Sequence, residues 1–116
     1  MTPKQTLRNK ADKLWKLKVI GDKTVCEVCG MEPINTAHHF FPKSLYGHLR
    51  YNLDNGVAIC KGEHFAHHHK GDPDIHFKIV VNRGAKWYKE LRDKSRETPA
   101  SYQTIKYFKE QITKLI

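Results

Sequence analysis

All eight histidines and all three cysteines of this 116-residue chain lie in its central part, between residues 26 and 82. Histidine and cysteine side chains are the ligands that zinc and similar metals prefer in proteins. The cysteines are odd in number and two of them form Cys26-x-x-Cys29, which favours metal binding over a framework of disulfides. The sequence therefore predicts a small core built around metal ligands.

The net charge of +9 is located entirely in the two segments that flank this centre. Residues 1–25 contain seven Lys or Arg and two Asp or Glu, and residues 83–116 contain nine and four. Residues 26–82 are nearly neutral, with five basic and six acidic residues. Basic surfaces of this kind favour nucleic acid as the partner, with simple solubility as the alternative explanation.

The length of the chain is that of one domain with a modest core. We expect a single domain over residues 1–116, with a basic N-terminal helix in 1–25, a metal-binding core in 26–71 and a basic helical extension in 72–116. No apolar run approaches the roughly 20 residues that a membrane span needs, and no signal-peptide pattern opens the chain. The expected location is therefore the cytoplasm.

Local signals divide the chain into five helices and two strands, which is an α+β composition. Thr2-Pro3-Lys4-Gln5 is a capping box with proline at the first helical position, and its helix is expected to run to about Leu17. Strands are expected over 36–41 and 55–59, joined by a long loop. The remaining helices are expected from 61 to Gly71, from Asp72-Pro73 to Gly84, over 85–96, and from Thr98-Pro99 onward.

The last of these helices has one apolar face. Ile105, Phe108, Ile112 and Leu115 recur at intervals of three, four and three, which places them on the same side. Such a face must be buried. It either folds back onto the core or pairs two copies of the chain.

The spacing of the histidines indicates a site for one divalent metal. His64 and His68 are four residues apart and share a helix face, which suits binding of a single ion. His38, on the first strand, can supply a third imidazole, and three imidazoles with an open position are typical of a catalytic site. His39 adjoins it. Because side chains alternate along a strand, we expect the two rings to have different roles.

The order of these residues resembles a known family. A histidine pair, then Asn55, then "ICKGEHFAHH" is similar to the signature of the HNH (ββα-metal) endonucleases. The stretches "VCEVCG", "AHHFFPKS" and "LRYNLDNGVAIC" also resemble that family, and the likeness covers roughly residues 26–70. A weaker resemblance, carried by "LRYNLDN", the glycine-rich break after it and the basic helical tail, is to phage recombination nucleases of the Rap type.

The resemblance implies a fold and a set of roles. The core would be a β-hairpin plus a helix, flanked by the basic N- and C-terminal helices. His39 would be the general base that deprotonates the attacking water, and Asn55 would brace the loop that holds the base or act as a ligand. One divalent ion (Mg, Mn, Ni or Zn) would be held by His38, His64 and His68. If the chain is phage-encoded, the cytoplasm is that of the host.

A second metal site is suggested by the cysteines. Members of the HNH family often carry a CxxC pair before the histidines and another after the asparagine. Here Cys60-Lys61-Gly62-Glu63 has glutamate at the position of the fourth thiolate. A structural zinc bound by Cys26, Cys29, Cys60 and Glu63, or by His67 instead of Glu63, is one possibility. The other is a decayed site whose thiols pack as small hydrophobic groups.

The sequence thus predicts a metal-dependent DNA endonuclease that hydrolyses phosphodiester bonds. The alternative is a non-catalytic, metal-stabilised DNA-binding module on the same scaffold. Contacts with backbone phosphates are expected from Lys10, Lys13, Lys16 and Arg50. If the apolar face of the last helix pairs two subunits, the homodimer would suit branched recombination intermediates, as the weaker resemblance implies.

Overall fold

The computed structural model describes residues 1–62, 73–97 and 103–116. This part of the chain forms helices around one antiparallel β-hairpin, so the predicted α+β class is confirmed. In chain order the elements are α1 (Pro3–Ile20), β1 (Thr36–His39), the 3-10 turns η1 (Gly47–Leu49) and η2 (Leu53–Asn55), β2 (Gly56–Ile59), α3 (Pro73–Arg83), α4 (Ala85–Ser95) and α5 (Ile105–Leu115). The helix predicted after Cys60 lies outside the described residues from residue 63 onward.

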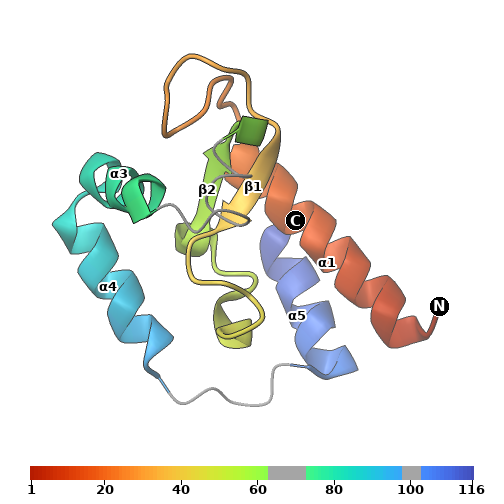
Figure 1. Ribbon diagram of the computed structural model, residues 1–116. Helices are drawn as coiled ribbons and strands as arrows, with labels where there is room; N and C mark the ends of the chain where they lie inside the picture. The colour runs from red at the N-terminus through yellow and green to blue at the C-terminus, as the bar shows by residue number, and fades with distance from the viewer. Residues whose placement is uncertain (63–72, 98–102) are drawn as a thin grey trace.

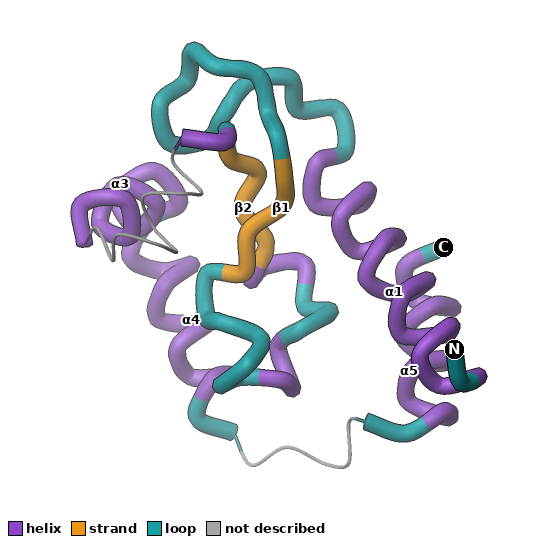
Figure 2. The backbone as a smooth tube through the Cα atoms, turned by 45° about the vertical axis from the view of Figure 1, so that its right-hand side comes forward, coloured by secondary structure: helices purple, strands orange, loops and turns teal. Residues whose placement is uncertain are grey.

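The hairpin lies between two pairs of helices (Figures 1 and 2). Helices α1 and α5 run side by side on one side of it, and α3 and α4 lie on the other. Strand β2 is buried along its whole length because helices cover both faces of the hairpin. This explains why its sequence is continuously apolar and does not alternate with polar residues.

Two hydrophobic clusters correspond to these two sides. The first joins the hairpin and the cysteines to α3 and α4, and contains Cys26, Phe40, Leu49, Val57, Ile59, Cys60, Ile75, Ile79 and Leu91. The second joins α1 to α5 and contains Ala11, Trp15, Val19, Tyr51, Phe108, Ile112 and Leu115. The hairpin is thus fixed from both sides, which gives its end a defined position relative to α1.

Helix α1 starts at the predicted capping box, in which Thr2 Oγ1 accepts from Gln5 N and Gln5 Oε1 accepts from Thr2 N. It continues to Ile20, beyond the predicted end near Leu17. Val19 is buried in the second cluster, so packing extends the helix by most of a turn. The close approach of α1 to β2 requires a glycine, because a methyl group on Gly56 would collide with Val19.

Several predicted boundaries are wrong by a few residues. Strand β1 ends at His39 instead of residue 41, and Asn55 closes η2 directly before β2 instead of opening the strand. Helix α5 begins at Ile105, where the Thr104 side chain accepts from Tyr107 N. The predicted start at Thr98-Pro99 lies outside the described part of the chain, which omits residues 98–102. Gly84, with φ of 98°, separates α3 from α4 as predicted.

The apolar face of α5 is covered within the chain. Phe108, Ile112 and Leu115 are buried against α1, and only Ile105 is substantially exposed, at 43%. Folding back onto the core is therefore the correct alternative for this face. A homodimer stays a prediction that this intramolecular packing does not support. No described helix is both long enough and apolar enough to cross a membrane.

Candidate functional site

His38 and His39 lie at the end of β1, opposite Val57 and Gly56 of β2. Both histidines line a cavity of about 600 Å³ between α1 and β1. We call this the histidine cavity; its other lining residues include Asp12, Trp15, Lys16 and Lys43. His38 is buried, at 1% exposure, whereas His39 is partly exposed.

The ring of His39 is held on two sides. It stacks on Trp15 of α1, with ring centroids 4.0 Å apart and planes inclined by 6°. Its Nε2 is 2.9 Å from the backbone oxygen of Arg50. A carbonyl oxygen only accepts, so this hydrogen bond requires the proton on Nε2 and leaves Nδ1 as the nitrogen that can accept a proton.

The pKa of His39 is lowered to about 4. Burial is the main cause; the hydrogen bond to the Arg50 carbonyl opposes it, and the positive charge of Lys43 adds to it. An ordinary histidine titrates near neutrality. In the free protein the ring is instead neutral at pH 7 and is a weaker base than an ordinary histidine.

Asn55 fixes the backbone around His39. Its side chain is fully buried; Oδ1 accepts from Phe41 N at 2.7 Å, and Nδ2 donates to Phe41 O at 3.0 Å and Leu49 O at 3.3 Å. One side chain therefore ties the segment after His39 to the segment before Arg50. The distance between these two segments determines whether His39 Nε2 can reach the backbone oxygen of Arg50. Asn55 therefore braces the loop between His39 and Arg50.

Arg50 also anchors this segment to α1. Its guanidinium donates to both carboxylate oxygens of Asp12, at 2.8 and 2.7 Å. Burial alone would raise the pKa of Asp12, but the hydrogen bond and charge of Arg50 outweigh it and lower that pKa. The Arg50 side chain, predicted to contact DNA, is thus already paired with a carboxylate.

The three cysteines converge at the first hydrophobic cluster. The Sγ atoms of Cys26, Cys29 and Cys60 all lie within 4.8 Å of one another, and those of Cys29 and Cys60 are 4.0 Å apart. Zinc–sulfur bonds of about 2.3 Å in a tetrahedron place sulfurs about 3.8 Å apart, so the cluster can hold a metal ion. Backbone N–H groups of Glu32 and Met31 bond the Cys29 sulfur and lower the pKa of its thiol, which favours the thiolate that binds metal.

The other predicted ligands cannot be placed relative to this geometry. Glu63, His64, His67 and His68 lie outside the described residues. The structure therefore brings together His38, His39 and Asn55 at one site and the three cysteines at another.

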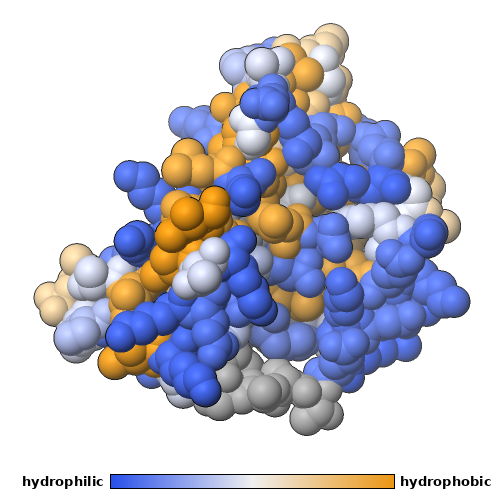
Figure 3. Space-filling model, turned by 180° about the vertical axis from the view of Figure 1, so that it is seen from behind, coloured by the Kyte–Doolittle hydropathy of each residue, from blue (hydrophilic) through white to orange (hydrophobic). Residues whose placement is uncertain are grey.

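The predicted DNA-contacting lysines of α1 are all exposed. Lys16 lines the histidine cavity, whereas Lys10 and Lys13 line none of the cavities described here. Hydrophilic residues predominate on the face of the molecule seen in Figure 3, with hydrophobic residues between them.

Three residues of the site, Trp15, Asp12 and Lys43, have no role in the prediction from the sequence. Asp12 and Arg50 are separated by 38 positions, and no local pattern links them. The one hint in the sequence is that Asp12 is an acidic residue in a helix whose other charged residues are all basic.

Comparison with protein-family models, curated proteins and solved structures found no match to this chain. The functional assignment rests on the residues and the geometry of the site.

Proposed function

We propose that the chain is a metal-dependent DNA endonuclease of the HNH (ββα-metal) type, hydrolysing phosphodiester bonds at the histidine cavity. The observation that carries this proposal is the pair of imidazoles at the end of β1. One of them is buried, and the ring of the other is oriented by Trp15 and the Arg50 carbonyl. A purely structural metal site needs ligands and has no use for a second, separately oriented imidazole.

In the proposed reaction His39 accepts a proton at Nδ1 from the attacking water, while its Nε2–H stays bonded to the Arg50 carbonyl. Asn55 keeps that carbonyl and the His39 backbone at a fixed separation. A bound phosphodiester brings negative charge beside the ring and raises its pKa from the low value of the free protein. His38, with His64 and His68, would hold one divalent ion, which when bound offsets charge on the scissile phosphate and leaving oxygen.

The cysteine cluster would hold a structural zinc. Its three sulfurs lie within 4.8 Å of one another, close enough to converge on one ion, and Glu63 or His67 would provide the fourth ligand. The ion would join the Cys26–Cys29 turn to the end of β2 that lies opposite Thr36, at the other end of the hairpin from His39.

A preference for branched DNA has less support. It depended on a dimer formed through α5, and that face is buried inside the chain. The proposal therefore concerns cleavage of DNA in general.

The direct test is incubation of the purified chain with plasmid DNA, in parallel with Mg²⁺, Mn²⁺, Ni²⁺, Zn²⁺ or a chelator, together with a binding assay on the same DNA. We expect nicked or linear product with at least one metal and none with chelator. Binding without cleavage under every condition would contradict the proposal and support the non-catalytic DNA-binding module.

A further inference from the structure

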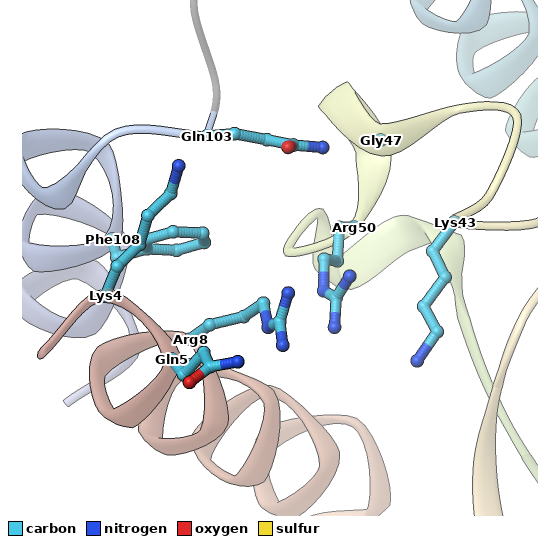
Figure 4. Close-up of a pocket in the computed structure, with 8 residues that line it drawn as sticks. All are labelled: Lys4, Gln5, Arg8, Lys43, Gly47, Arg50, Gln103 and Phe108. Carbon is cyan, nitrogen blue, oxygen red and sulfur yellow. The ribbon is translucent and has the colours of Figure 1, made fainter. Parts of the chain in front are cut away.

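A second cavity, of about 220 Å³, lies at the N-terminal end of α1. We call it the basic cavity; it is lined by Lys4, Gln5, Arg8, Lys43, Arg50 and Gln103, among others. Three segments that are distant in sequence form it: the start of α1, the loop between the strands and the residues that precede α5. In Figure 4 the side chains of Arg8 and Arg50 extend toward one another across this space.

The charges in this cavity are strongly unbalanced. Of its four cationic residues, Arg50 is paired with Asp12. Over residues 1–62, 73–97 and 103–116, no acidic side chain forms an ion pair with Lys4, Arg8 or Lys43. Like charges gathered in one concave site repel each other and produce a local positive potential, which an anion relieves. Arginine and lysine side chains are the usual partners of phosphate.

The basic cavity and the histidine cavity are neighbours along α1. Lys4 and Arg8 line the first, and Asp12, Trp15 and Lys16 line the second, so they follow one side of the same helix. Lys43 lines both. The centres of the two helix segments are about eight residues apart, which corresponds to about 12 Å along the helix axis. A DNA strand advances about 3.4 Å per nucleotide along the duplex axis and more along its own backbone, so that distance corresponds to a few nucleotides.

We infer that the basic cavity binds a backbone phosphate of the DNA strand that is cut, a few nucleotides from the scissile phosphate. This inference rests on the proposed nuclease function. Arg8, Lys43 and Lys4 would position the DNA strand, and none of them is among the DNA contacts predicted from the sequence. Arg50 also lines this cavity and adds to the attraction for the phosphate, although its guanidinium is paired with Asp12.

The first experiment measures binding, with chelator present so that no cleavage occurs. Affinity for a short duplex is determined over a range of salt concentrations for the wild type, for Arg8→Gln/Lys43→Gln, and for the control Lys89→Gln/Lys94→Gln, which removes two charges from α4. We expect the first variant to bind roughly tenfold more weakly, with a salt slope smaller by about one. Equal losses in both variants would overturn the inference, because any two positive charges would then serve.

The second experiment locates the phosphate. Duplexes carrying one neutral methylphosphonate linkage are scanned along the cut strand in a cleavage assay. For the wild type we expect KM to rise by several-fold at one position away from the cut, with kcat little changed. The same linkage should have little further effect on Arg8→Gln/Lys43→Gln, because the charges that contact it are already absent. A scan in which no position depends on these two residues would overturn the inference.

Inorganic phosphate distinguishes a DNA site from a site for the free anion. If millimolar phosphate raises the Tm of the wild type but not of Arg8→Gln/Lys43→Gln, while both bind DNA equally, the cavity serves the free anion and the inference is wrong. Failure of the nuclease proposal has a different outcome. The chain would then bind DNA with the expected difference between variants and cut it under no condition.

Discussion

Arg50 performs two functions with different parts of the residue. Its backbone oxygen accepts from His39 Nε2, and its guanidinium pairs with Asp12 on α1. The position of the imidazole therefore depends on an ion pair with the N-terminal helix. His39 also stacks on Trp15 of that helix, so α1 is part of the site.

Replacing Asp12 tests this pair. Asp12→Asn removes the carboxylate and leaves the partly buried guanidinium with a weaker acceptor, so we expect a loss of about 1 kcal/mol in the free energy of unfolding at pH 7. Urea unfolding measures it. Asp22→Asn, at an exposed residue, is the control and should change stability by less than about 0.5 kcal/mol.

The same pair predicts a pH dependence. Because folding lowers the pKa of Asp12 below its ordinary value of 3.8, the ionised carboxylate stabilises the folded state above that value. This contribution is lost as the pH falls through the pKa of the folded state. The stability difference between wild type and Asp12→Asn should therefore be largest near pH 7 and shrink below pH of about 3.8. An equal difference at pH 7 and pH 3 would show that the carboxylate charge is not responsible.

At the scale of elements, the cysteine turn is held to the fold by more than its sulfurs. The Glu27 side chain, inside the Cys26-x-x-Cys29 motif, accepts from Arg83 of α3 at 3.0 Å and also bonds Ala58 N of β2. The turn thus joins the hairpin to α3 whether or not a metal is bound. A metal would add to an arrangement that protein contacts already define.

We expect one zinc ion to remain bound when His38 and His64 are both replaced by Ala, because the cysteine cluster is a separate site. It should be lost in Cys26→Ser/Cys29→Ser, together with part of the folding stability, since a structural zinc contributes directly to folding. Elemental analysis and thermal unfolding measure the two effects. A Cys26→Ser/Cys29→Ser protein as stable as the wild type, with unchanged metal content, would instead favour the decayed site.

Helix α5 completes the second hydrophobic cluster. Phe108 is 2% exposed, so Phe108→Ala should lower the free energy of unfolding by about 3–5 kcal/mol. Ile105→Ala, at the exposed end of the same face, should cost less than about 1 kcal/mol. Urea unfolding of both variants gives the comparison. Similar costs at the two positions would contradict the packing of α5 described above.

The sequence predicts helix starts and breaks better than it predicts the contacts of the site. The capping box at Thr2 and the glycine at position 84 are local signals, and they identified the start of α1 and the break between α3 and α4. The end of α1 was missed because it depends on packing of Val19 against the hairpin. At the site, the adjacency of His38 and His39 was visible in the sequence. The stacking on Trp15 and the pairing of Asp12 with Arg50 join distant segments and require the fold.

At the scale of the whole molecule, the positive charge is not spread evenly over the two basic flanks. Part of it gathers with Lys43 in the basic cavity, which shares that residue with the histidine cavity. This arrangement fits a strand that follows α1 past the two histidines. Lys10 and Lys13 are exposed but line neither cavity, so they would supply only general attraction for DNA.

The central claim is that His39 acts as the base, and a single-turnover cleavage rate tests it most directly. The rates of wild type, His39→Ala and the control His76→Gln are compared on one DNA duplex, with the metal that supports activity. Loss of a general base costs roughly a hundredfold to ten-thousandfold, so we expect that loss in His39→Ala, with DNA affinity nearly unchanged and the control close to wild type. Cleavage by His39→Ala at the wild-type rate would contradict the assignment.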